Sequence, residues 1–287
     1  MSSTSPTSSE VLSLLPEMLL CGGGVLILLL DAISARLRPL WTPLALAFTV
    51  AAGWGAWASW DAISPSGGAV LTWNGLLETS QVTVAFSLVV LLSTLLCLLA
   101  SQGYLRREGI LSGEYYALLL WCAAGLLLVL RSTELLTVFL SLELFSLCLY
   151  CLAAYHRRVS LSLEAAIKYF LMGAFVSAFV LYGIALVYGA TGSTRFAAVA
   201  QALAGGHGTL MASLGLLLLV AGFGFKMSLV PFHAWSPDTY QGAPSPFVAF
   251  LSVAPKVASA LVLYRLLAVA ASQGLSGTGP KWAGIVA

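Results

Sequence analysis

Long apolar runs recur along the whole chain, and they constrain the fold more than any other feature. A helix of about 20 apolar residues crosses the roughly 30 Å hydrocarbon core of a bilayer, and runs near that length follow one another here. The composition agrees, since 60% of the residues are hydrophobic and 8% are charged, whereas soluble domains carry about 25% charged residues. We therefore expect an all-α fold, a polytopic transmembrane helical bundle.

The runs predict eight membrane crossings and the start of a ninth. Loop signals at 64–68 (SPSGG) and 204–208 (AGGHG) separate some of them, and 195–203 is expected to form a short helix on the membrane surface. Ser132 or Thr133 is the expected N-cap of the fifth crossing. The crossings are expected at 11–30, 40–60, 80–101, 114–130, 133–154, 162–188, 210–232 and 246–268, with a ninth beginning at 281–287.

Paired arginines mark alternate connections between the predicted helices. They fall in the first, third and fifth connections: Arg36 and Arg38, Arg106 and Arg107, Arg157 and Arg158. The positive-inside bias places these connections in the cytoplasm, and the N-terminus therefore on the periplasmic side of a bacterial inner membrane. The first ten residues are polar and lack the basic region of a signal peptide, so we expect the first helix to be retained.

Neither a cofactor nor a nucleic acid finds support in the residue pattern. Cys148 and Cys151 form a C-x-x-C within an apolar run, but no second pair and no nearby histidine accompany them. Small buried hydrophobes are therefore favoured over a metal or redox site. No glycine-rich phosphate loop follows a strand, and the net charge is only +2. We expect no cofactor, no metal and no nucleic-acid partner for this chain.

Several ionisable side chains are expected at membrane depth. Glu143 and Lys256 lie about ten residues, or about 15 Å, into their helices, and Lys226 lies well inside the seventh. Lys168 follows Glu164 by four residues near the start of the sixth, which is also the spacing of an ordinary helix ion pair. Because each mid-membrane charge costs about 2.5–3.5 kcal/mol on insertion scales, we expect these groups to face one another or water.

Pro231 predicts a helix break close to Lys226. Proline has no N–H, so the carbonyl of Met227 loses its partner four residues on, and broken membrane helices often mark ion sites. Glu143 and Lys226 are predicted to form a pair whose changing separation loads and releases a proton; a purely structural pair is the alternative. Imidazole is suited to relay protons at physiological pH, so His233 is the expected next relay, although it can equally cap backbone groups at the break.

Lys256 and Arg265 share the eighth predicted helix but receive different interpretations. Lys256 has no acidic residue within one turn and lies too deep to snorkel, so its partner must come from another helix or from water. Arg265 lies close to the end of its helix and is expected to snorkel. We interpret Lys256 as a proton relay, with an anchoring charge as the alternative.

Four segments resemble the antiporter-like subunits of respiratory complex I. Their fifth and sixth helices are matched by LSLELFSLCLYCLAAYHRR (140–158) and EAAIKYFLMGAFVSAFVLYGIALVYGATGS (164–193). Their seventh and eighth are matched by FKMSLVPFHAWSPDTYQGAPSP (225–246) and SVAPKVASALVLYR (252–265). The PDTYQGAP wording is closer to the N-type members, called subunit 2 in mitochondria, than to the M and L types. The resemblance is strong over about 110–270 and loose over the first three helices.

The resemblance implies an antiporter-like inverted-repeat fold with a broken seventh helix. The family has fourteen helices in two inverted five-helix repeats, so 1–109 would hold helices one to three and 110–270 the first repeat. The remaining 271–287 would begin a truncated remainder, and the family's lysine on the twelfth helix is not expected here; the chain is read either as a fragment or as a natural truncation. The implied proton-translocation residues are Glu143 with Lys226 as coupling pair, Lys256 as central relay, and Lys168, Glu164 and His233 in support.

The resemblance also implies a function within a larger enzyme. The chain would be a membrane subunit of NADH:quinone oxidoreductase that takes part in proton translocation coupled to quinone reduction, with no redox centre of its own. NADH, FMN, iron–sulfur clusters and quinone would belong to the complex, and the partners would be antiporter-like subunit M, small subunits such as K and J, and the lipid bilayer. The alternatives are an Mrp-type or standalone cation/proton antiporter, a membrane hydrogenase subunit, and a chain that packs in the complex without pumping.

Overall fold

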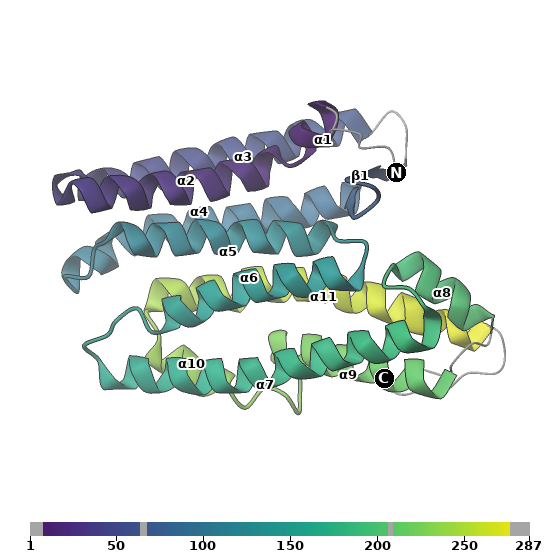
Figure 1. The fold of residues 1–287 in the computed structure, drawn as a ribbon. Coiled ribbons are helices and arrows are strands. Elements are labelled where there is room, and N and C mark those ends of the chain that lie inside the picture. Colours follow the sequence, from purple (N-terminus) through teal and green to yellow (C-terminus); the bar gives the residue numbers. More distant parts are fainter. Residues whose placement is uncertain (1–7, 64–67, 206–208, 276–287) are drawn as a thin grey trace.

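The computed structural model describes residues 8–63, 68–205 and 209–275. Long helices lie side by side in rows and run back and forth between two ends of the molecule (Figure 1). Within the described ranges, a single hairpin interrupts them, formed by β1 (Val70–Thr72) and β2 (Leu77–Thr79). The helices are α1 (Ser8–Ser13), α2 (Leu15–Ile33), η1 (Ala35–Leu40), α3 (Trp41–Ile63), α4 (Gln81–Arg107), α5 (Gly113–Arg131), α6 (Leu135–Ala153), α7 (Ser160–Thr191), α8 (Phe196–Ala204), α9 (Thr209–Lys226), α10 (Ser236–Gly242) and α11 (Ser245–Leu275).

Each predicted crossing corresponds to one long helix, so the predicted all-α membrane fold is confirmed. Within the described residues, six helices are long and apolar enough to cross a membrane by length and composition: α2, α4, α5, α6, α7 and α11. The other two predicted crossings correspond to α3 and to α9, whose apolar part Leu210–Lys226 is shorter. The predicted short helix at 195–203 is confirmed as α8. The predicted start of a ninth crossing at 281–287 lies outside the described residues. So do most residues of the loop signals at 64–68 and 204–208.

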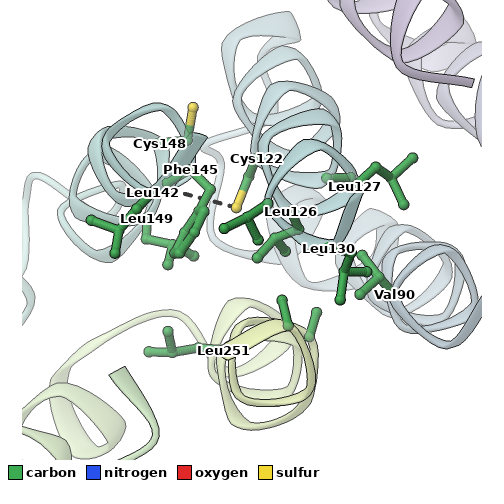
Figure 2. Close-up of a cluster of buried hydrophobic side chains, with 14 of the residues drawn as sticks. Val90, Cys122, Leu126, Leu127, Leu130, Leu142, Phe145, Cys148, Leu149 and Leu251 are labelled. Carbon is green, nitrogen blue, oxygen red and sulfur yellow. Dashed lines mark hydrogen bonds between the residues drawn. The ribbon is translucent and has the colours of Figure 1, made fainter. Parts of the chain in front are cut away.

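The core of the bundle forms where α5, α6 and α11 meet. Leu126 and Leu130 of α5 and Leu251 of α11 lie in one apolar cluster with Phe145 of α6 (Figure 2). Each of these side chains is at most 2% exposed. Lipid tails are as apolar as these side chains, so in a membrane the cluster holds its helices together through close van der Waals packing.

The two cysteines of the C-x-x-C are both free thiols, but only Cys148 is buried. Cys148 lies in the cluster of Figure 2 together with Cys122, whose thiol donates to the carbonyl of Phe145 at 3.7 Å. Cys151 is exposed on the surface of this chain, so the prediction that it is buried is wrong. Among the described residues, no group of three histidine, cysteine or acidic side chains is arranged to hold a metal.

Small residues let α7 and α9 pack closely. A Cβ atom on Gly215 of α9 would lie 2.7 Å from the carbonyl oxygen of Gly183 on α7, and one on Gly183 would lie 2.8 Å from the carbonyl of Gly215. Such reciprocal glycines are typical of membrane helices whose backbones approach each other. The close packing holds α9, and hence Lys226 at its end, in a fixed position.

The arginine pairs lie at one end of the bundle, which we call the arginine end. The carboxylate of Asp31, in the last turn of α2, accepts from the backbone N–H of Gly113 at 2.9 Å and from the indole N–H of Trp41 at 3.0 Å. Arg157, between α6 and α7, lies 3.7 Å from Glu114. These contacts join the first, third and fifth connections, and α4 ends there with Arg106 and Arg107. The predicted alternation of the connections is therefore confirmed.

The opposite end, which we call the hairpin end, contains two ion pairs that sequence interpretation missed. Arg131 donates to the Glu17 carboxylate at 2.7 Å and to the Thr79 hydroxyl at 2.9 Å, with both charged side chains buried. Arg265, which was expected to snorkel, forms an unpredicted contact with the hairpin, where its guanidinium lies 3.5 Å from Glu78 of β2. Removing one partner of a buried ion pair costs about 3–5 kcal/mol, so the Glu17–Arg131 contact ties α2 firmly to the end of α5.

The hairpin also explains why the predicted N-cap of α6 is wrong. The N-cap is Glu134, and no side chain caps the helix there. The backbone N–H of Thr133 instead donates to the carbonyl of Leu76 at 3.0 Å, while the Ser132 hydroxyl donates back to Leu128 of α5 at 2.7 Å. Ser132 is the C-cap of α5 and pairs with Leu77 of β2, so both its hydroxyl and its backbone are engaged before α6 begins.

Candidate functional site

A turn at the C-terminus of α9 brings Lys226 into the interior. The backbone N–H of Leu229 donates to the carbonyl of Gly224 at 2.9 Å, and that of Ser228 donates to Phe225 at 3.0 Å. With Ser228 in the left-handed region at φ 58°, these bonds form a Schellman motif, which closes a helix by satisfying its last carbonyls. The break therefore precedes Pro231, and the prediction that the seventh helix continues to 232 is wrong.

Lys226 is the last residue of α9 and is only 3% exposed. Its ammonium donates to the hydroxyl of Ser146 at 2.8 Å and to that of Tyr150 at 3.3 Å, both on α6. The rings of Phe145, Tyr150 and Phe225 have their centroids 5.4–5.9 Å away. Cation–π contacts contribute about 2 kcal/mol or more where water is excluded, and a helix C-terminus favours a cation. The direct contacts of this ammonium are thus all with neutral groups.

Glu143 lies near Lys226 but does not bind it directly. The carboxylate acts electrostatically on the ammonium, yet no ion pair joins the two among the described residues. One carboxylate oxygen, Oε1, is buried without a hydrogen-bond partner in the part of the chain that the structure describes. The structure therefore brings the predicted pair to facing helices in a separated arrangement.

Lys256 lies on α11 directly after Pro255 and is half-buried. Its ammonium lies 5.4 Å from the centre of the Tyr240 ring on α10, and within the described residues it forms no ion pair. The Tyr240 hydroxyl is itself buried without a hydrogen-bond partner in the described chain. As expected, no acid on its own helix neutralises Lys256, and the nearest partner comes from another helix.

A chain of aromatic rings connects the surroundings of the two lysines. Tyr150, which binds Lys226, meets the edge of Tyr169 at 4.8 Å between ring centres. Tyr169 stacks on Trp235 at 4.5 Å, and Trp235 meets Tyr240 at 6.3 Å. The indole N–H of Trp235 donates to the carbonyl of Phe225 at 3.0 Å, which adds a second hydrogen bond to a carbonyl that already accepts from Ser228 at the end of α9. Packing among these rings holds α10 next to the surroundings of both Lys226 and Lys256.

The predicted supporting residues lie on a different surface. Lys168 contacts Glu164 at 2.8 Å, as the i,i+4 spacing predicted, and also Asp238 of α10 at 2.9 Å, which was not predicted. These three side chains are 45–60% exposed on this chain. His233 is also exposed, and its backbone carbonyl, not its ring, accepts from Ser236 at 3.0 Å. Neither Lys168 nor His233 contacts Lys226 or Lys256 in the described structure.

The fold and the site together define a polytopic helical membrane protein with a lysine buried at the end of a broken helix. Residues 132–278 match the family model described as "NADH:quinone oxidoreductase/Mrp antiporter, TM", which covers half of the chain. The chain therefore belongs to this family.

Curated relatives agree with this family assignment. The chain is 38% identical over 260 residues to "NADH-quinone oxidoreductase subunit N" of Trichlorobacter lovleyi, covering 90% of this chain and 52% of the relative. It is 44% identical over 194 residues to "NADH-quinone oxidoreductase subunit N 2" of Koribacter versatilis, covering 67% and 39%. The chain thus spans about half the length of the curated relatives it matches.

Solved structures share the fold. A chain of respiratory complex I from Thermus thermophilus with bound aureothin superposes with a TM-score of 0.74 at 33% identity, covering 87% of this chain and 52% of that one. A chain of the membrane-bound sulfane sulfur reductase, an archaeal respiratory membrane complex, gives 0.82 at 25% identity, covering 91% and 53%. The Mrp complex from Dietzia sp. DQ12-45-1b gives 0.75 at 22% identity, covering 91% and 49%, which shows the fold alone.

Proposed function

We propose that this chain is a membrane subunit of NADH:quinone oxidoreductase and takes part in moving protons as quinone is reduced. The observation that carries the proposal is Lys226, buried at a helix break among neutral groups, on the helix facing Glu143. A charged side chain at membrane depth is expensive, so it marks a functional site by default. The relatives named subunit N, at 36–44% identity, favour this complex over other assemblies that share the fold.

The remaining parts of the proposal follow from that assignment. The redox chemistry, with its FMN, iron–sulfur clusters and quinone, belongs to other subunits, and the neighbours in the membrane are antiporter-like subunit M and small subunits such as K and J. Residues 110–270, from α5 to α11, form the first five-helix repeat. Lys256 acts as a relay beyond Lys226, while Lys168, Glu164 and His233 support the path from the surface of this chain.

Co-isolation tests the function. If the chain is tagged in its host and purified from detergent-solubilised membranes, we expect FMN, iron–sulfur clusters and NADH:quinone activity to purify with it. An antiporter of the Mrp type, which shares the fold, would instead purify without these centres and would exchange sodium for protons in vesicles. The second result would overturn the proposal.

The arginine end is proposed to face the cytoplasm and the hairpin end the periplasm. The paired arginines gather at the arginine end, and cytoplasmic connections are rich in lysine and arginine. We expect Arg158→Cys and Gly205→Cys, at opposite ends of the bundle, to be labelled by a membrane-impermeant thiol reagent from opposite sides. A Cys151→Ser background removes the exposed native thiol. Labelling of both positions from one side would refute this orientation.

A further inference from the structure

The hydroxyls of Ser146 and Tyr150 form a defined binding place for the Lys226 ammonium, which we call the hydroxyl seat. The Ser146 hydroxyl donates its only proton to the carbonyl of Leu142 on its own helix. A hydroxyl has one proton and two lone pairs, so Ser146 presents only lone pairs to the lysine and accepts at 2.8 Å. Tyr150 supplies the second oxygen at 3.3 Å.

The packing around Tyr150 holds its hydroxyl in the seat. Its ring meets the edges of Tyr169 and Phe170, with ring centres 4.8 and 5.5 Å away. On α7, a Cβ atom added to Gly173 would lie 2.0 Å from the Tyr150 hydroxyl oxygen. Real Cβ atoms do not approach an oxygen so closely, so glycine at position 173 leaves the room that this hydroxyl occupies. The seat is thus built by two helices, α6 and α7.

The seat and the carboxylate lie on one face of α6. Glu143, Ser146 and Tyr150 are spaced i, i+3 and i+7, and the first two are separated by a rise of about 4.5 Å along the helix. Lysine has a flexible four-carbon stem, which allows its ammonium to move between neighbouring groups over such a distance. In this structure the ammonium lies in the seat, and a carboxylate oxygen of Glu143 is left buried without a partner among the described residues.

We propose that Ser146 and Tyr150 are positioning residues that compete with Glu143 for the Lys226 ammonium and so provide the separated state of the pair. This inference rests on the proposed function. Without an alternative place to bind, a buried ammonium beside a carboxylate stays paired with it, because separating the two leaves both unsatisfied. With the seat, both arrangements satisfy the ammonium, and a small change nearby shifts its position.

Tyr150→Phe tests the inference, because it removes one seat oxygen and keeps the ring with its packing. We expect Lys226 to move to Glu143, within about 4 Å, in a cryo-EM structure of the assembled complex. We also expect proton uptake per NADH oxidised to fall about tenfold or more, which corresponds to 1.4 kcal/mol. Gly173→Ala should act in the same direction by displacing the hydroxyl.

Matched variants separate positioning from packing. Tyr116→Phe, which removes a buried hydroxyl that bonds Thr42 away from the seat, should leave uptake near the wild-type value. Ser146→Ala should behave like Tyr150→Phe, while Ser146→Thr, which keeps a hydroxyl, should retain most of the uptake; the serine pair decides the matter if Tyr150→Phe does not assemble. Two results would overturn the positioning role of the seat. One is wild-type proton uptake in Tyr150→Phe, and the other is a structure of that variant in which Lys226 is still bound at Ser146. Wild-type uptake in Lys226→Ala would instead overturn the proposed function.

Discussion

Replacing Lys256 with arginine is expected to abolish proton translocation while the positive charge at this position is kept. A relay must populate both its protonated and its neutral form, and arginine does not deprotonate in proteins. Positioned proton-transfer groups contribute about 10²–10⁴-fold to a rate, so we expect proton uptake to fall by about a hundredfold or more. The measurement is proton uptake into inverted membrane vesicles, normalised to the amount of assembled complex.

The surroundings of Lys256 make this substitution a sharp test. The ammonium lies over the ring of Tyr240 at 5.4 Å, and a guanidinium binds an aromatic face at least as well. If Lys256 is only an anchoring cation, arginine therefore preserves its contact and the complex should pump normally. Normal uptake in Lys256→Arg would show that the relay assignment is wrong.

Glu143→Gln is expected to reduce proton uptake and quinone-linked turnover together, by about a hundredfold where transport and redox chemistry are tightly coupled. The amide has nearly the shape of the carboxylate but carries no charge, so Lys226 loses its acidic alternative to the hydroxyl seat. Because the two groups form no contact ion pair in the described structure, we expect assembly to survive the change. Both rates are measured on the same vesicles.

Glu114→Gln is the matched control for this substitution. Glu114 lies 3.7 Å from Arg157 at the arginine end, and the two side chains are 55% and 78% exposed. Exposed ion pairs contribute about 0–1 kcal/mol, so we expect little change in either rate. Wild-type pumping and turnover in an assembled Glu143→Gln complex would contradict the role of Glu143.

The helices were predictable because hydrophobic length sets them, whereas the hairpin was not. Each apolar run gave one helix, since lipid and core both require continuous apolar surface. The hairpin contains the turn Trp73–Asn74–Gly75, with all three residues at positive φ. Asn-Gly between short runs rich in β-formers is a hairpin signal, and the apolar background obscured it. Ser132 pairs with Leu77 of the hairpin, which is distant in sequence, and therefore does not cap α6 as expected.

The helix break was predicted with the wrong cause. Pro231 indicated an interruption, and an interruption exists, but Ser228 ends α9 earlier by taking the left-handed conformation. Serine seldom does so, and backbone propensity alone gives glycine or asparagine for that place. The tight packing of α9 against α7 and the indole bond from Trp235 to Phe225 hold this conformation, and neither is visible in local sequence.

The ionisable residues of the site were predictable, but their neutral partners were not. Charge at membrane depth singled out Glu143, Lys226 and Lys256 directly. Ser146 and Tyr150 escaped notice, although their spacing from Glu143 places all three on one helix face, and a search for polar residues at helical spacing would have found them. Asp238 was within the quoted break segment, but its contact with Lys168 depends on where α10 packs.

Proton uptake per NADH oxidised by the assembled Lys226→Ala complex tests the central claim most directly. Lys226 is the buried group at the helix break, and alanine removes its ammonium while Ser146 and Tyr150 remain. If this chain moves protons through Lys226, uptake must fall by about a hundredfold, or turnover must fall with it under tight coupling. The account would be contradicted if an assembled Lys226→Ala complex kept both the wild-type proton uptake per NADH oxidised and the wild-type turnover.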